Sequence, residues 1–156
     1  MNWPVVVLFY GGTSWLSRVI QRLTRSPFSH AAVYLQPSGR LYEALGRGII
    51  LRVGHEAHER AGKAKASVVV TVNETDYRQM RAFLNRRVND KYAFLNFIAA
   101  GLNTLLPHLP LVTSDGRRYI CSGLVAEALC KADFDFDEPS LMTPGDLARE
   151  LGVKDV

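Results

Sequence analysis

The stretch HAAVYLQPSGRLYEAL, residues 30–45, contains two short apolar runs on either side of the turn-forming sequence QPSG. Runs of this length, separated by proline and glycine, predict a β-hairpin. If QPSG forms a four-residue loop, Glu43 on the second strand faces Ala32 on the first. Glu43 then lies on the same face of the sheet as His30 and diagonal to it, at a Cα separation of about 7–8 Å. A two-residue loop would instead move Glu43 and His30 too far apart for contact.

Further apolar runs predict the remaining strands of a small antiparallel sheet. We expect strands at residues 5–10, 48–53 and 67–72, in addition to the two strands of the hairpin. The polar segment GHEAHERAGKAKA, residues 54–66, lacks such a pattern and is expected to form a loop or a lid. Because the strands precede most of the helical patterns, the expected fold class is α+β, with helices packed on the sheet.

Apolar residues at spacings of three and four predict several helices. Ser14 is the candidate cap of the first helix, and Pro144 fits the first turn of the last one. Amphipathic or buried helices are also expected over residues 75–88, over residues 92–106 and from Cys121 onward. The apolar stripe of the first helix consists of Trp15, Leu16, Val19, Ile20 and Leu23.

Length and composition indicate one globular domain that spans residues 1–156. Hydrophobic residues make up 47% of the chain and charged residues 22%, which is ordinary for a protein with a folded core. The formal charge of +4 favours anionic partners only mildly. Because lysine and arginine are spread along the chain, a nucleic-acid partner is not expected.

Neither a signal peptide nor a transmembrane helix is expected. The N-terminal sequence MNWPVVVLFYGG lacks a basic leading region and has the pattern of a strand. The longest apolar region begins at Tyr92, is interrupted by Asn96 and Asn103, and falls short of the ~20 residues that a membrane span needs. We therefore expect a cytoplasmic protein as synthesised, with export by another route left open.

Both cysteines of the chain lie in RRYICSGLVAEALC, residues 117–130. Cys121 falls in the first turn of the amphipathic helix expected there, where unpaired N–H groups and the helix dipole lower the pKa of a thiol. This position suits a nucleophile, although a free cysteine is also a common small core residue. Cys130 lies on nearly the opposite face, about 13 Å away by helical rise, so no disulfide is expected, in keeping with a reducing compartment.

A thiol nucleophile needs a base, and the base needs a group that orients it. His30 is the candidate base because it opens a strand and the hairpin returns Glu43 beside it, where a carboxylate fixes the imidazole tautomer. Taken singly, His30 fits an ordinary strand-end residue, and Glu43 fits a polar residue that faces solvent. The other histidines lack such partners, since His55 and His58 lie in the polar segment without a further metal ligand and His108 lies between prolines.

Four stretches of the chain, SPFSHAAVYLQPSGRLYEALGRGI, NDKYAFLNFI, ICSGLVAEAL and MTPGDL, carry a resemblance to a known family. Together they resemble the permuted branch of the NlpC/P60 superfamily of papain-like proteins, the YiiX-like group, and more distantly the lecithin:retinol acyltransferase-like proteins. The order is diagnostic: histidine first, a carboxylate on the next strand, and cysteine last on a helix. The resemblance spans roughly Val5 to Leu147 and implies a circularly permuted papain-like fold.

The resemblance also implies a cysteine hydrolase with Cys121 as nucleophile, His30 as general base and acid, and Glu43 as the orienting third residue. It implies no cofactor and no metal. The implied reaction is cleavage of an amide bond, first of all in peptidoglycan stem peptides or a related peptide, and a cell-wall substrate would then require export. A lipid acyltransferase or (thio)esterase with the same triad, and a non-catalytic binding module, are the alternatives. Gly123 stands where YiiX-like members commonly have glutamate, so substrate preference does not carry over.

Overall fold

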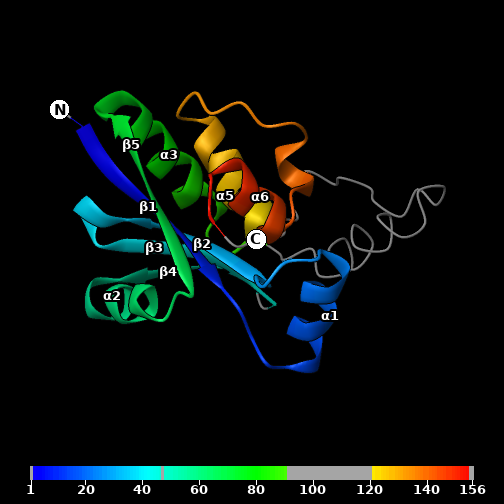
Figure 1. Cartoon of the computed structure of the whole chain (residues 1–156). Helices are drawn as coiled ribbons and strands as arrows, with labels where there is room; N and C mark the ends of the chain where they lie inside the picture. Colours follow the sequence, from blue (N-terminus) through cyan, green and yellow to red (C-terminus); the bar gives the residue numbers. More distant parts are fainter. Residues whose placement is uncertain (1, 47, 91–120, 155–156) are drawn as a thin grey trace.

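A computed structural model describes residues 2–46, 48–90 and 121–154 of the chain. Over these residues the protein is α+β, with a five-stranded antiparallel sheet and five α-helices (Figure 1). The strands lie in the order β4-β3-β2-β1-β5 across the sheet. All the predicted strands are present, as β1 (Asn2–Tyr10), β2 (His30–Leu35), β3 (Arg40–Leu45), β4 (Gly48–Val53) and β5 (Ala66–Asn73).

The hairpin of β2 and β3 has the register predicted from a four-residue loop. Ala32 pairs with Glu43, and Leu35 pairs with Arg40. Residues 36–38 form one turn of 3-10 helix, and Gly39 closes the loop at a φ of 60°, a left-handed conformation that glycine adopts without steric penalty. The loop therefore fixes the face of the sheet on which Glu43 lies.

The predicted helices that fall within the described residues are present, and their caps explain where they begin. The side chains of Ser14 and Asn73 accept hydrogen bonds from backbone N–H groups in the first turns of α1 and α3. Thr143 and Asp146 form a capping box at the start of α6. The helix expected over 92–106 lies outside the described residues. The helices are α1 (Trp15–Leu23), α2 (Gly54–Gly62), α3 (Glu74–Arg87), α5 (Cys121–Cys130) and α6 (Pro144–Glu150).

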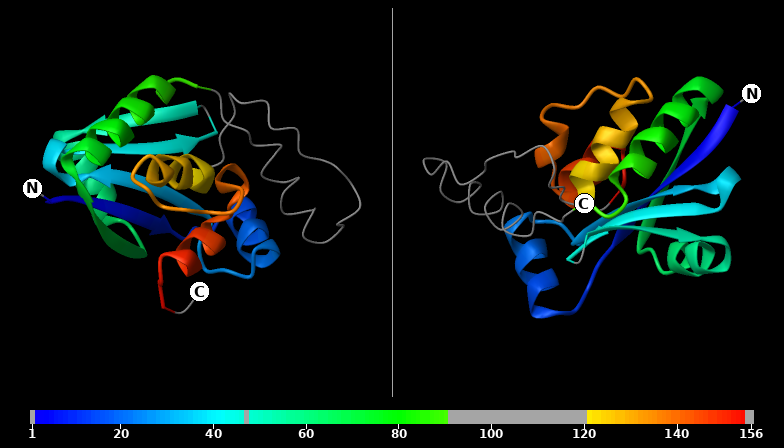
Figure 2. Two further views of the ribbon diagram at one scale, coloured as in Figure 1. Left: turned by 90° about the horizontal axis from the view of Figure 1, so that it is seen from above. Right: turned by 180° about the vertical axis from the view of Figure 1, so that it is seen from behind.

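Helices cover both faces of the sheet, as Figures 1 and 2 show. On one face, α3, α5 and α6 lie over the main core, in which Phe9, Val33 and Tyr42 of the sheet pack with Leu124 of α5. On the opposite face, α2 buries Ala57 in a second, smaller apolar cluster. Helix α1 stands at the end of the sheet where β1 ends and β2 begins.

The expectation that residues 54–66 form a loop or a lid is wrong. Most of this segment is α2, which packs on the face of the sheet that α5 does not cover, so it does not cover Cys121. The sequence of this segment shows no helical repeat of apolar residues, because Ala57 is the one side chain of α2 that is buried. The ion pair of Lys63 with Glu59, four residues apart, lies on the exposed side of this segment.

Two helices depart from the amphipathic patterns expected for them. The first six residues of α5, residues 121–126, are all buried, because the sheet, α3 and α6 enclose the helix. Helix α1 is less buried than its apolar stripe predicted. Ile20 is the one residue of that stripe that is buried, and Trp15 and Val19 are exposed. Among the helices of the described residues, none has the length and apolar character required to cross a membrane.

Candidate active site

His30 is the first residue of β2, and the chain around it is held by the end of β1. Tyr10, the last residue of β1, pairs with His30. The N–H of Ser29 donates to the carbonyl of Tyr10 at 2.9 Å, and Phe28 is buried against Phe9 with ring centroids 5.2 Å apart. The imidazole is therefore presented from a firmly anchored segment, with 16% of its side chain exposed.

Cys121 is the first residue of α5, and the packing of α5 on β2 brings its thiol to His30. The thiol is 1% exposed. It is hydrogen-bonded to the His30 side chain and to the backbone N–H groups of Ala31 and Ser122. The hydroxyl of Ser122 donates to the carbonyl of Met142, which fastens the first turn of α5 to the chain ahead of α6. The nucleophile predicted from the sequence thus lies against the predicted base.

Cys121 and His30 shift each other's pKa toward a thiolate and an imidazolium. Burial raises the pKa of Cys121, but the charge and hydrogen bond of His30, with the two backbone N–H groups, outweigh burial and lower the pKa. Burial likewise lowers the pKa of His30, but the charges and hydrogen bonds of Cys121 and Glu43 outweigh burial and raise this pKa to about 9. Both shifts favour the charged forms, thiolate and imidazolium, and the thiolate is the nucleophilic form of cysteine.

Glu43 lies on the same face of the sheet as His30 and holds the far side of the imidazole. Its side chain is fully buried, and Oε2 lies 3.0 Å from Nε2 of His30. Because an ionised carboxylate only accepts hydrogen bonds, Nε2 carries the proton and Nδ1 is left to share a proton with the thiol. The diagonal placement predicted from the loop therefore leads to direct contact.

Two arginines complete a cage around the Glu43 carboxylate. Arg52 of β4 donates from Nε to Oε1 at 2.7 Å. Arg60 of α2 donates to Oε2 from both Nη2, at 2.9 Å, and Nε, at 3.2 Å. Burial raises the pKa of Glu43, but hydrogen bonds from His30, Arg60 and Arg52 outweigh it and lower the pKa to about 2. Glu43 therefore stays ionised and orients the imidazole without taking its proton.

Arg60 is itself held by Tyr10, which links α2 to the strand that pairs with His30. The guanidinium carbon of Arg60 lies 4.0 Å from the centroid of the Tyr10 ring, and the Tyr10 hydroxyl donates to the Arg60 carbonyl at 3.0 Å. Burial raises the pKa of Tyr10 to about 12, so the phenol remains a neutral donor. Arg52 is held in turn by an ion pair with Glu56 of α2. Helix α2 thus supports the carboxylate on its own face of the sheet, directly through Arg60 and indirectly through Glu56 and Arg52.

Sequence reasoning did not identify Arg52 or Arg60 as part of this site. A signal for Arg52 was present, because Ile50 pairs with Glu43 and side chains two residues apart on a strand share a face. No comparable signal existed for Arg60, because residues 54–66 were expected to lack regular structure. The orientation of Arg60 toward Glu43 depends on the packing of α2, which the local sequence does not specify.

The remaining candidates do not join the site. His55 and His58 lie on α2 and are exposed, as expected. Cys130, at the other end of α5, is a free cysteine like Cys121, and the two form no disulfide. His108 lies outside the described residues. Within the residues that the structure describes, no group of three or more histidine, cysteine, aspartate or glutamate side chains is placed to hold a metal ion.

Comparison of the chain with known protein families finds no matching family model, and comparison with curated proteins finds no match.

Proposed function

We propose that the protein is a cysteine hydrolase that cleaves amide bonds with Cys121, His30 and Glu43, on a circularly permuted papain-like fold. The observation that carries the proposal is the connected triad, in which the Cys121 thiol contacts His30 and Glu43 Oε2 lies 3.0 Å from His30 Nε2. A connected nucleophile, base and orienting group is the arrangement that covalent catalysis requires. The lowered pKa of Cys121 also argues against a non-catalytic binding module, in which a thiol has no reason to be activated.

In the first half of the reaction, the Cys121 thiolate attacks the carbonyl carbon of the amide and forms a tetrahedral oxyanion. The carbon–nitrogen bond then breaks as the His30 imidazolium gives its proton to the leaving amine. The products of this half are a free amine, a thioester on Cys121 and a neutral imidazole. The Glu43 carboxylate keeps the imidazole aligned throughout by accepting the hydrogen bond of Nε2.

In the second half, the neutral imidazole of His30 takes a proton from water, and the hydroxyl attacks the thioester carbon. Collapse of this intermediate breaks the carbon–sulfur bond, releases the carboxylic acid and restores the thiolate and imidazolium. The N-terminal backbone N–H groups of α5 are the proposed donors to the oxyanion, because Cys121 is the first residue of that helix.

The proposed acyl group is a peptide, and peptidoglycan stem peptides are the first substrates to test. The support for this choice is the resemblance of the chain to the NlpC/P60 superfamily. The same triad would also serve acyl transfer or (thio)ester hydrolysis on lipids, since the chemistry at the carbonyl carbon is shared. Product identity therefore has to be measured alongside bond cleavage.

The test is to incubate the protein with purified peptidoglycan, with soluble stem peptides and with phospholipid, and to identify the products by mass spectrometry. We expect an amine and an acid from a stem peptide, complete loss of turnover in Cys121→Ala, and normal turnover in Cys130→Ser. Cleavage by Cys121→Ala at the parent rate would contradict the proposal. If fatty acid were released in place of peptide, the proposed triad would stand, and the proposed substrate would change from a peptide to a lipid.

A further inference from the structure

Helix α1 exposes apolar side chains that a helix packed at the end of a sheet ordinarily buries. Trp15 is 74% exposed and Val19 is 39% exposed, while Ile20 on the other side of the helix is buried. Trp15 and Val19 are four residues apart and therefore lie on the same side of the helix. An exposed indole next to an exposed aliphatic side chain is a common feature of surfaces that bind a partner.

Arginines flank these apolar side chains, and among the described residues the acidic side chain that lines the same hollow is Asp146 of α6. Arg18 and Arg22 lie on α1, and Arg25 follows its C-terminal cap. None of the three forms an ion pair with any residue that the structure describes. The first acidic residue of the whole chain is Glu43, which is committed to the buried cage. Within the part of the chain that the structure describes, Arg18, Arg22 and Arg25 therefore leave α1 and its C-terminal end positively charged, because Asp146 across the hollow is paired with Arg149.

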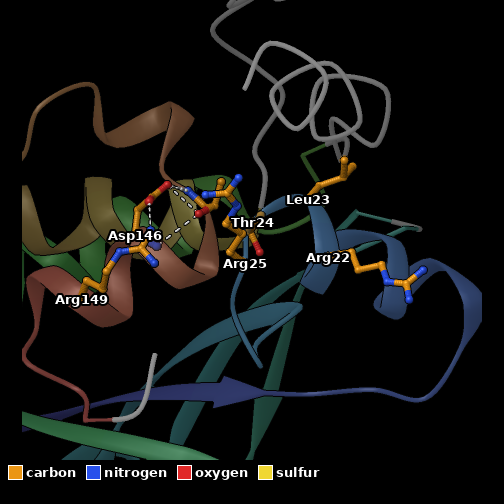
Figure 3. A pocket seen from close by; sticks show the side chains of 7 residues that line it. Arg22, Leu23, Thr24, Arg25, Asp146 and Arg149 are labelled. Atoms are coloured by element: carbon orange, nitrogen blue, oxygen red, sulfur yellow. Dashed lines mark hydrogen bonds and ion pairs between the residues drawn. The ribbon is translucent and has the colours of Figure 1, made fainter. Parts of the chain in front are cut away.

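Two hollows open between these arginines. One, of about 550 Å³, lies between α1 and α6 and is lined by residues that include Arg22, Arg25 and the ion pair of Asp146 with Arg149 (Figure 3). The other, of about 420 Å³, runs along Arg18, Val19 and Arg22. Arg25 has a φ of 48°, a left-handed conformation that is uncommon outside glycine.

We propose that α1 and Arg25 form a docking surface for a bilayer that contains anionic phospholipid. Trp15 and Val19 enter the boundary between headgroups and acyl chains, and Arg18, Arg22 and Arg25 contact the lipid phosphates. Tryptophan prefers that boundary, and arginine binds phosphate through several N–H groups at once. A nucleic acid has no apolar region into which an aliphatic side chain such as Val19 could insert. Arginines beside exposed apolar side chains therefore favour a lipid surface over a nucleic acid. The inference is independent of the reaction at Cys121.

Docking through α1 would place the triad close to the lipid surface. Helix α1 follows β1, which ends at Tyr10, and precedes β2, which begins at His30. Tyr10 and His30 are paired, so both connections of α1 reach the same end of the sheet. A surface-bound protein would thus present the His30 end of the sheet to substrates near the bilayer, whatever their acyl group.

The experiment measures binding of the full chain to vesicles of phosphatidylcholine, with and without phosphatidylglycerol, by co-sedimentation and by tryptophan emission. The chain has two tryptophans, so Trp3→Phe leaves Trp15 as the reporter. The charge variant is Arg18→Glu with Arg22→Glu. The matched control is Arg81→Glu with Arg86→Glu on α3, which changes the net charge equally at two other exposed positions. Circular dichroism confirms that each variant is folded.

We expect binding to anionic vesicles that weakens with added salt, with a blue shift of the Trp15 emission. The charge variant should lose at least about tenfold in affinity, because reversing charges near an anionic surface adds repulsion to the lost attraction. The α3 control should bind like the parent. The proposal is overturned if no vesicle binds, if the charge variant and its control bind equally, or if a single-stranded RNA binds through these arginines while vesicles do not.

Discussion

The carboxylate of Glu43 lies 3.0 Å from Nε2 of His30 across two adjacent strands, with the Glu43 side chain fully buried. Arg52 donates a hydrogen bond to Oε1 of this carboxylate. Arg60 donates to Oε2, the oxygen that also contacts His30. A carboxylate with so many charge-assisted hydrogen bonds has one fixed orientation. The position of the imidazole relative to the Cys121 thiol therefore depends on the ion cluster of Glu43, Arg52 and Arg60 on the α2 face of the sheet.

Replacement of Glu43 by glutamine should slow turnover more than it changes substrate binding. The amide has the shape of the carboxylate but lacks the charge that stabilises the imidazolium, so we expect kcat to fall by about 10²-fold or more while KM changes little. Steady-state kinetics on the peptide substrate measure both constants. If kcat/KM fell by the same factor through a rise in KM alone, Glu43 would act on substrate binding rather than on His30.

Replacement of Arg60 by methionine should weaken both the fold and the triad. The methionine side chain preserves much of the volume, but Glu43 loses two hydrogen bonds and Tyr10 loses its cation–π partner. Because Arg60 is partly exposed and Arg52 remains, we expect a loss of about 1–3 kcal/mol in the free energy of unfolding, measured by urea denaturation.

The control for Arg60 is Lys63→Ala, which removes an exposed ion pair with Glu59 one turn further along. That variant should unfold like the parent, because exposed ion pairs contribute little. Equal behaviour of Arg60→Met and Lys63→Ala would mean that α2 does not support Glu43.

The activity should show a bell-shaped dependence on pH. The active form holds Cys121 as thiolate and His30 as imidazolium, so activity rises as the thiol ionises, below the free-thiol pKa of about 8.5. It falls again as His30 loses its proton, near its raised pKa of about 9. The profile of kcat/KM against pH measures both limbs. In Glu43→Gln the alkaline limb should move to lower pH, since one cause of the raised pKa is gone.

Acid should destabilise the fold through Glu43. Its pKa falls from 4.5 to about 2 on folding, so its contribution is fully present above pH 4.5 and is lost as the pH falls through 2. A shift of this size in a fully buried group corresponds to about 3 kcal/mol. Urea denaturation between pH 7 and pH 2 should therefore show a steeper loss for the parent than for Glu43→Gln. Parallel curves would contradict the lowered pKa.

The contact between His30 and Glu43 was predictable because it depends on a local feature, the length of one hairpin loop. Glycine at the left-handed position of that loop fixes the register, and the register fixes which side chains share a face. The location of Cys121 at the start of a helix followed from periodicity in the same way. These parts of the site are encoded over short stretches of sequence.

The rest of the site depends on tertiary packing that leaves little trace in the local sequence. Arg60 reaches Glu43 because α2 packs on the face of the sheet opposite α5. The side chain that α2 buries there is Ala57, which is small. The burial of α5 on all sides follows from the elements around it rather than from its own pattern. The stripe of α1 was visible in the sequence, but periodicity does not reveal that Trp15 would be exposed.

The activation of Cys121 by His30 is tested most directly by the pH dependence of Cys121 alkylation by iodoacetamide, followed by intact mass in a Cys130→Ser background, in the parent and in His30→Ala. We expect one labelled sulfur in the parent, with a midpoint well below the free-thiol value of about 8.5 that moves upward without His30. A midpoint at the ordinary value that His30→Ala leaves unchanged would contradict activation of Cys121 by His30, and Cys121 would then be a packing residue of α5.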